Sequence, residues 1–329
     1  MHIVVIGGTG HIGTYLVPGL VRRGHQVTVL SRGERAPYQR DGAWTQAKLV
    51  QVDRAAEEAD GTFGRRVAEL APDVVIDLIC FTPDSARQLV DAISGQVEHL
   101  LHCGTIWVHG ASATVPTRED APRAPFGDYG IQKAAIERYL LGQSRRGGVP
   151  ATVIHPGHIS GPGWTPVNPA GNLDVGVYRT LSRGDELVLP NLGLETVQHV
   201  HAVDVAGVFL AALEGRSAAV GESFHAVAEG AMTLRGYAEA VAAWFGQDAR
   251  LGFLPFEQWK AGVSERDAEI TYDHIAHSPH CSMDKAARML GFRPRYTALD
   301  AALEGLSRLD IAGVEETRSD DDDPRLFQR

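Results

Sequence analysis

The sequence predicts an α/β protein built on a doubly wound parallel sheet, with a smaller α/β lobe toward the C-terminal end. Two observations predict this class. Short β-branched runs alternate with longer amphipathic stretches through the first half of the chain, which is the pattern of βαβ units. A glycine-rich turn also follows the first apolar run directly and leads into an amphipathic stretch, as in sheets that bind a ligand at their carboxyl edge.

The predicted strands are short apolar runs, and the predicted helices lie between them. Six strands are expected at residues 3–6, 26–30, 49–52, 74–77, 99–103 and 151–155. Helices are expected at 13–23, 63–70, 84–94 and 129–141. An apolar stretch at 205–213 predicts a helix that packs back on the sheet, and residues 223–227 predict one more strand.

The regular alternation weakens after Pro156, where prolines and glycines become frequent. We therefore expect a nucleotide-binding domain formed by 1–165 plus about 197–230, and a substrate-binding lobe formed by 166–196 plus 231–312. The segment 313–329 contains the run Asp320–Asp323 and is expected to be a disordered acidic tail.

Composition restricts the classes of partner and compartment. The 329 residues include 41 acidic and 31 basic side chains, a formal net charge of −10 that argues against a nucleic-acid partner. No apolar run approaches the roughly 18 residues of a membrane span, and a strand at the N-terminus leaves no room for an export signal. Three widely spaced cysteines, Cys80, Cys103 and Cys281, suit a reducing compartment. We expect a cytoplasmic protein without a membrane partner.

The turn at residues 7–13 (GGTGHIG) predicts a Rossmann-type dinucleotide site. Its glycines permit a tight turn, a close approach of the backbone to a pyrophosphate, and close packing of the following helix on the strand. The N-terminus of that helix faces the anion. The residues predicted to bind the cofactor here are Gly7, Thr9, Gly10, His11, Ile12 and Gly13.

The end of the second strand indicates which dinucleotide binds. An acidic residue there would bind the adenosine ribose, whereas Ser31 and Arg32 suit a 2′-phosphate. NADP is therefore the expected cofactor and NAD the second choice. The alternative that Arg32 is only a solvated loop residue stays open. Asp53, after the third strand, is placed to contact the adenine, but Asp is also a common strand-terminating residue.

Tyr129 and Lys133 are the candidate catalytic pair. They lie four residues apart and thus on one face of a helix. An ammonium beside a phenol favours the phenolate, so we expect the pKa of Tyr129 to fall from about 10 toward the working range, which would let Tyr129 exchange a proton with a substrate oxygen. Thr105 follows the fifth strand, at the edge where a parallel sheet binds its ligand.

The glycine turn, Thr105 and the Tyr129/Lys133 pair together resemble the extended or atypical short-chain dehydrogenase/reductase superfamily, which contains NAD(P)-dependent epimerases and dehydratases. Three later segments share this resemblance. Residues 155–163 (HPGHISGPG) resemble its R-P-x-N-x-Y-G-P segment, 200–206 (VHAVDVA) its H-V-D-D-V-A segment, and 290–294 (LGFRP) its L-G-F-x-P segment. The opening of the chain also resembles a branch that includes chloroplast RNA-associated proteins.

The resemblance implies roles for individual residues. Thr105 would bind the reacting oxygen, Tyr129 would be the acid/base, and Lys133 would bind the nicotinamide ribose. Pro156 would contact the cofactor and His158 the substrate. Trp107 is expected to line the substrate pocket because it lies beside Thr105 in the sequence. A homodimer is expected for this superfamily.

Departures from the family pattern narrow the reaction. Ile106-Trp107 replaces the acidic pair of the dehydratases, so water elimination is not expected. His158 replaces an asparagine, His109 a tyrosine, and residues 78–81 (LICF) differ from the usual H-L-A, which argues against a nucleotide-diphosphate substrate.

The expected function is that of an epimerase-type NAD(P)-dependent oxidoreductase. It would act on a secondary alcohol or ketone of a sugar or sugar-nucleotide-like substrate through a transient ketone. An NADPH-dependent ketoreductase of small-molecule biosynthesis is the alternative, and a non-catalytic cofactor-binding or RNA-associated protein is the alternative from another class.

No metal site is expected. Residues 273–281 hold three histidines and Cys281, but Pro279 interrupts them and they lack a recognised ligand frame. We expect this segment to be a loop of the substrate lobe that leads into a final helix at 283–290.

Overall fold

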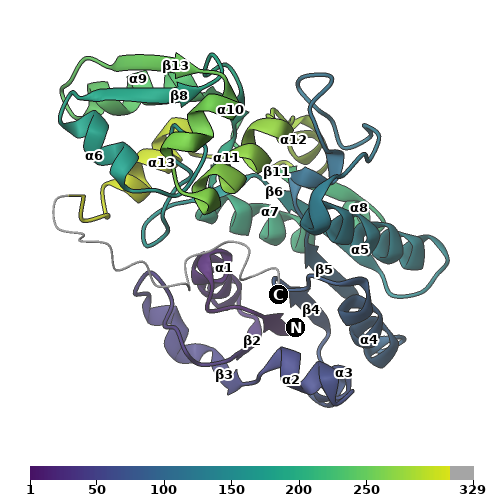
Figure 1. The fold of residues 1–329 in the computed structure, drawn as a ribbon. Helices are drawn as coiled ribbons and strands as arrows, with labels where there is room; N and C mark the ends of the chain where they lie inside the picture. The colour runs from purple at the N-terminus through teal and green to yellow at the C-terminus, as the bar shows by residue number, and fades with distance from the viewer. Residues whose placement is uncertain (312–329) are drawn as a thin grey trace.

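The computed structural model describes residues 1–311, which form a seven-stranded parallel sheet with helices on both faces and a smaller lobe above it (Figure 1). The order of the strands across the sheet is β11-β6-β5-β4-β1-β2-β3. Their bounds are β1 (His2–Ile6), β2 (Gln26–Ser31), β3 (Lys48–Gln51), β4 (Val74–Asp77), β5 (His99–Cys103), β6 (Ala151–Pro156) and β11 (Ser223–Ala226). All seven predicted strands and the doubly wound fold class are confirmed, and the predicted tail at 313–329 lies outside the described residues.

Alternation along the central strands divides the core between the two faces of the sheet. Ile3 and Val5 of β1 pack on one face, and Val4 and Ile6 on the other. The first face is covered by α1 (His11–Arg22) and α7 (Ala202–Glu214). The second is covered by α3 (Phe63–Glu69), α4 (Pro83–Ile93) and α5 (Gly127–Arg145). The predicted helices of this domain are therefore confirmed, and a short α2 (Arg54–Ala59) is added.

A third hydrophobic core holds the smaller lobe together. In this lobe β8 (Glu186–Pro190) pairs in parallel with β13 (Arg250–Leu254). The fully buried Tyr178 and Tyr237 place their hydroxyl oxygens 3.1 Å apart in this core. The helices around it are α6 (Gly176–Ser182), α9 (Leu234–Trp244), α10 (Phe256–Trp259), α11 (Glu265–His277) and α13 (Ala298–Leu306). The division of the chain into two domains at the predicted boundaries stays a prediction.

The remaining elements are short and lie in the connections between these strands and helices. They are η1 (Gly42–Gln46), η2 (Ile106–His109), β7 (His158–Ser160), β9 (Thr196–Val197), β10 (His199–His201), α8 (Arg216–Ala219), β12 (Met232–Thr233), η3 (Lys260–Gly262) and α12 (Asp284–Leu290). Within residues 1–311, none of the helices combines the length and the apolar character that crossing a bilayer requires.

The expectation of a loop at 273–281 is wrong in its first half. Ser264 caps α11 by accepting a hydrogen bond from the backbone N–H of Asp267, and the buried Ala268, Thr271 and Ile275 give the helix a continuous inward face. Because this buried face continues past His274, the helix extends to His277. The helix at 284–290 is confirmed, but it is followed by α13 and is not the final helix.

Candidate active site

The glycine-rich turn brings the N-terminus of α1 against the end of β1. Gly7 has a φ of +79°, and its backbone N–H donates to the carbonyl of Leu30 at 2.8 Å. A Cβ on Gly13 would lie 2.0 Å from the carbonyl oxygen of Gly8, so only glycine lets α1 pack this closely on the turn. No side chain caps α1, and its first turn holds no acidic residue. Its first amide groups are thus free to bind an anion.

The surroundings of the turn fit the pyrophosphate of a dinucleotide. A Cβ on Gly10 would meet only the carbonyl oxygen of Gly7, at 3.4 Å, so space lies above this residue. His11 is buried and stacks on Trp164, with 5.1 Å between the two ring centres. Neither ring nitrogen of His11 has a hydrogen-bond partner among the described residues. Burial, with His201 nearby, lowers the pKa of His11 to about 3, so its ring is uncharged at neutral pH. The free amide groups at the start of α1 and the ring nitrogens of His11 therefore lie around the open space at Gly10.

Two of the other predicted residues of the turn differ in exposure. Thr9 is half-buried at the turn, whereas the side chain of Ile12 packs in the core beneath α1. Only the backbone of Ile12 is therefore available to a ligand.

The residues predicted to select the cofactor lie at the ends of β2 and β3. Ser31 ends β2 and Arg32 follows it, exposed and paired with Glu34 at 3.1 Å. Asp53 lies between β3 and α2, where its Oδ1 accepts from the N–H of Ala56 at 3.1 Å and caps the helix. Its placement near the adenine stays a prediction.

Thr105, Tyr129 and Lys133 come together at the carboxyl edge of the sheet. Thr105 caps η2 just after β5, and its side chain lies beside that of Tyr129 in the first turn of α5. Lys133 is 1% exposed, and its Nζ donates to the carbonyl oxygens of Cys80 and Cys103, each at 2.8 Å. The same nitrogen lies 5.7 Å from the centre of the Tyr129 ring. An ammonium has three N–H donors, so one remains for another oxygen.

The expected lowering of the Tyr129 pKa is wrong in this structure. Burial raises the pKa of Tyr129 well above its usual value, Cys103 adds to the rise, and the Thr105 side chain only partly opposes it. Lys133 is not among the groups that shift this pKa, and its ammonium donates to the carbonyls of Cys80, which follows β4, and Cys103, which ends β5. Burial also lowers the pKa of Lys133. Tyr129 is therefore a neutral phenol here, ready to donate its proton.

Aromatic rings and imidazoles surround the Tyr129 group. Trp107 meets the Tyr129 ring edge-on at 5.9 Å and stacks on His277 at 4.2 Å. Phe126 covers the other side of His277 at 4.0 Å. His158 in β7 lies 4.8 Å from His274, which itself lies 5.4 Å from Trp107. Pro156 is buried at the end of β6.

Two of these histidines present complementary unpaired nitrogens. Nδ1 of His158 accepts from the N–H of Gln198 at 3.2 Å, so in its neutral form Nε2 carries the proton. Nδ1 of His277 donates to the carbonyl of Asp273 at 2.6 Å, which leaves Nε2 as an acceptor. Both Nε2 atoms are buried without a partner among the described residues. Burial lowers the pKa of both rings, to about 4 for His277. One donor and one acceptor thus stand ready for a ligand.

The part played by α11 was not predicted from the sequence. His274 and His277 are three apart and so share a helix face, which is the one local signal that could have shown that they act together. His109 contacts a different imidazole, since its Nε2 lies 2.8 Å from Nε2 of the buried His225.

Within the described residues, one group of three potential metal ligands lies within reach of a common ion, and it is not in the 273–281 segment. Ligand atoms of Asp77, Cys80 and His102 lie within 4.8 Å of one another. Arg54 donates to Oδ1 of Asp77 at 2.7 Å and so supplies a positive charge to this carboxylate. Burial raises the pKa of Cys80 to about 12 and keeps its thiol protonated.

Comparisons with known proteins agree with this geometry. The model of the NAD dependent epimerase/dehydratase family matches residues 3–226. The chain is 27% identical to the chloroplast stem-loop binding protein of 41 kDa b of Arabidopsis thaliana, over 91% of this chain and 76% of that protein. It is 31% identical to a 2′-dehydrokanamycin reductase of Streptomyces kanamyceticus over a shorter stretch, 42% of this chain and 37% of the relative.

A solved structure of similar fold is that of UDP-glucose 4-epimerase from Thermotoga maritima with UDP-glucose. It superposes with a TM-score of 0.70 at 21% identity and covers 94% of this chain and 98% of the epimerase. The family model spans the turn, the strands of the sheet and the Thr105–Tyr129–Lys133 group. This chain belongs to the NAD-dependent epimerase/dehydratase family, and it is an NAD(P)-dependent enzyme of the short-chain dehydrogenase/reductase type.

Proposed function

We propose that this enzyme oxidises and re-reduces a secondary alcohol of a sugar-like substrate, which epimerises the carbon through a transient ketone. The observation that carries the proposal is the group in which the half-buried Tyr129 lies beside Thr105, and the buried Lys133 places its Nζ 5.7 Å from the centre of the Tyr129 ring. This group lies at the carboxyl edge of the same sheet that holds the glycine turn.

The residues of the group divide the proton chemistry among them. The bound dinucleotide supplies or accepts a hydride at the substrate carbon. In reduction, Tyr129 donates its phenolic proton to the carbonyl oxygen as that oxygen gains negative charge. Lys133 stabilises the resulting phenolate, and the Thr105 hydroxyl donates to the same substrate oxygen. Epimerisation starts with oxidation, for which Tyr129 would have to be the phenolate and take the proton of the substrate hydroxyl. The phenol formed in this way returns that proton to the ketone oxygen on re-reduction, so protons balance over one epimerisation.

The two unpaired imidazole nitrogens support a substrate rich in hydroxyl or carbonyl groups. His158 would donate from Nε2 to a substrate oxygen, and His277 would accept at Nε2 from a substrate hydroxyl. Both rings are neutral at pH 7 because burial lowers the pKa of each. Neutral groups do not offset the charge of a diphosphate, so we propose a sugar-like substrate without one.

A second candidate function is the NADPH-dependent reduction of a ketone. It is favoured by the raised pKa of Tyr129, because the phenol then keeps the proton that reduction consumes. Arg32, which follows β2 where we predict that a 2′-phosphate binds, also favours it. The Streptomyces relative is named as a reductase. NADP is accordingly our proposed cofactor, with NAD as the second choice.

A binding-only role, suggested by the name of the Arabidopsis relative, does not account for this group. A net charge of −10 also opposes an RNA partner. We therefore propose catalysis, in a homodimer as expected for this superfamily.

The two enzymatic candidates are separated by one assay. The enzyme is mixed with stoichiometric NADPH and a panel of keto-sugars, and the absorbance of the reduced nicotinamide is followed. A ketoreductase consumes one NADPH for each ketone reduced. An epimerase interconverts the corresponding alcohols with catalytic cofactor and no net change in absorbance. Neither outcome with any member of the panel would contradict the proposed substrate class.

A further inference from the structure

A cleft separate from the dinucleotide turn lies between α5, α12, the start of β11 and the segment 118–123. Its volume is about 470 Å³, within the range of roughly 300–1,000 Å³ that small-molecule sites occupy. β11 is an edge strand of the sheet, and α12 packs beside it (Figure 1). Six basic side chains line it: Arg118, Arg123, Arg138, Arg145, Lys285 and Arg288.

The basic residues are arranged along two facing helices. Arg138 and Arg145 lie on one side of α5, where Ala134 and Leu141 continue the same stripe at spacings of three and four residues. Lys285 and Arg288 are three residues apart on α12 and share a face in the same way. A ligand in the cleft would therefore meet positive charge from two sides.

The acidic residues of the cleft are already engaged. Four line it, and each has a partner: Glu119 accepts from the N–H of His225 at 3.0 Å, Asp120 pairs with Arg118 at 3.6 Å, Glu137 with Arg123, and Glu222 with Lys285 at 2.8 Å. These carboxylates leave the remaining guanidinium groups unopposed.

Arg138, Arg145 and Arg288 have no hydrogen bond or ion pair from their guanidinium groups to any other residue in the described part of the chain. All three are exposed, and they leave an excess of positive charge in a protein whose overall charge is −10. Guanidinium groups match phosphate oxygens in geometry as well as charge. Walls of low dielectric also focus the field inside a cleft.

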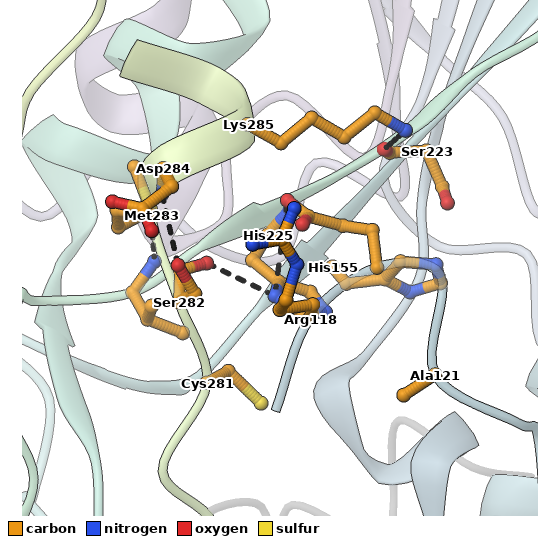
Figure 2. Close-up of polar contacts among 12 residues, drawn as sticks. Arg118, Ala121, His155, Ser223, His225, Cys281, Ser282, Met283, Asp284 and Lys285 are labelled. Atoms are coloured by element: carbon orange, nitrogen blue, oxygen red, sulfur yellow. Dashed lines mark hydrogen bonds and ion pairs between the residues drawn. The ribbon is translucent and has the colours of Figure 1, made fainter. Parts of the chain in front are cut away.

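We propose that this cleft is a second anion site, which binds a small molecule carrying more than one phosphate group. Lys285 fixes one wall, because its Nζ donates to the carbonyl of Ser223 at 2.7 Å as well as to Glu222, and Figure 2 shows this side chain reaching from α12 to β11. The three unpaired arginines supply the groups that bind the phosphates. The site is distinct from the dinucleotide cleft and needs no contribution from it.

A buried chain of polar contacts connects the cleft to Thr105. Arg123 holds Glu137 through two hydrogen bonds of 2.8 and 2.6 Å, and Glu137 accepts from Nε2 of His155 at 3.1 Å. Nδ1 of His155 accepts the backbone N–H of Thr105 at 3.0 Å, which places the proton of the neutral ring on Nε2. An anion that draws Arg123 toward the cleft competes with Glu137 for it. The cleft is thus connected to Thr105 through Arg123, Glu137 and His155.

The test measures binding and does not depend on the proposed reaction. Full-length protein saturated with NADP, which fills the dinucleotide site, is titrated with inorganic pyrophosphate by calorimetry at 0.15 M salt. The variant Arg138→Gln/Arg145→Gln/Arg288→Gln removes the unpaired charges from exposed positions. The control Arg65→Gln/Arg250→Gln/Arg308→Gln makes the same change of net charge at exposed positions outside the cleft lining.

We expect one pyrophosphate to bind per chain. The cleft variant should weaken binding at least tenfold and the control less than twofold, because remote charges are screened beyond about 8 Å at this salt concentration. Absence of binding to the NADP-saturated protein would overturn the proposal, as would equal weakening in the two variants. A 20-nucleotide RNA that binds more tightly than pyrophosphate and is lost in the cleft variant would overturn it in favour of a nucleic-acid surface.

Discussion

Replacing Gly13 by alanine tests the turn that is assigned to the dinucleotide. The added Cβ would lie 2.0 Å from the carbonyl oxygen of Gly8 and 2.4 Å from its carbon, whereas ordinary contact begins near 3.4 Å. Both partners are backbone, so α1 and the turn must separate by more than 1 Å. Overpacking of this kind costs about 1–3 kcal/mol and at times more, so we expect a loss of about 3 kcal/mol in the free energy of unfolding.

The same displacement moves the amide groups at the start of α1 away from the pyrophosphate. We expect the affinity for NADPH to fall at least tenfold, which is about 1.4 kcal/mol. Urea unfolding followed by circular dichroism measures the first effect, and fluorescence titration with NADPH measures the second.

Two other glycines serve as matched controls. Alanine at Gly10 meets only the carbonyl oxygen of Gly7 at 3.4 Å, so it should leave stability nearly unchanged and weaken NADPH binding by filling the space above the turn. Alanine at Gly42, where no atom lies within 4 Å, should change neither quantity. Unchanged stability and NADPH affinity in Gly13→Ala would refute this account of the turn.

Three further predictions concern the site and its supports. Burial opposes ionisation of Glu137, but His155 and Arg123 outweigh it and hold the pKa of this carboxyl far below its usual range. The ionised Glu137 therefore stabilises the fold fully above pH about 4.3, the pKa of a glutamate in the unfolded chain. This stabilisation is lost progressively as the pH falls from there toward the lower pKa of the folded state. Glu137→Gln should cost about 3 kcal/mol at pH 7 and less at pH 4, measured by urea unfolding, and an equal cost at both pH values would contradict the pairing. His277→Phe keeps a stacked ring but removes the Nε2 acceptor, so the KM for the carbonyl substrate should rise about tenfold with unchanged cofactor affinity, and an unchanged KM would exclude this contact. Arg32→Asp should weaken NADP binding at least tenfold more than NAD binding, and equal affinities for both cofactors before and after the change would refute the role of Arg32.

The fold of the first domain follows from local patterns in the sequence. The strands at 74–77 (VVID) and 99–103 (HLLHC) are buried along their whole length because both faces of a parallel strand are covered, and they occur at the predicted positions. The lobe was less predictable, since elements such as β9 and β12 are two residues long and exist only through tertiary pairing.

The candidate site also has features that the sequence predicts and features that only the tertiary structure determines. The convergence of Thr105, Tyr129 and Lys133 could be predicted, because a helical spacing of four and a strand end are local features. The direction of the Tyr129 pKa shift could not be predicted, because it depends on tertiary burial and on the nearby Cys103. His277 was missed because tertiary packing brings α11 to Trp107 across more than half of the chain.

Tyr129→Phe tests the central claim most directly, because it removes only the hydroxyl that is proposed to donate the proton. Its affinity for NADPH should stay within about twofold of the wild type by fluorescence titration. With a keto-sugar that the wild-type enzyme turns over, kcat should fall at least 10²-fold, the contribution expected of a general acid. A variant that binds the cofactor and turns over at the wild-type rate would contradict the account.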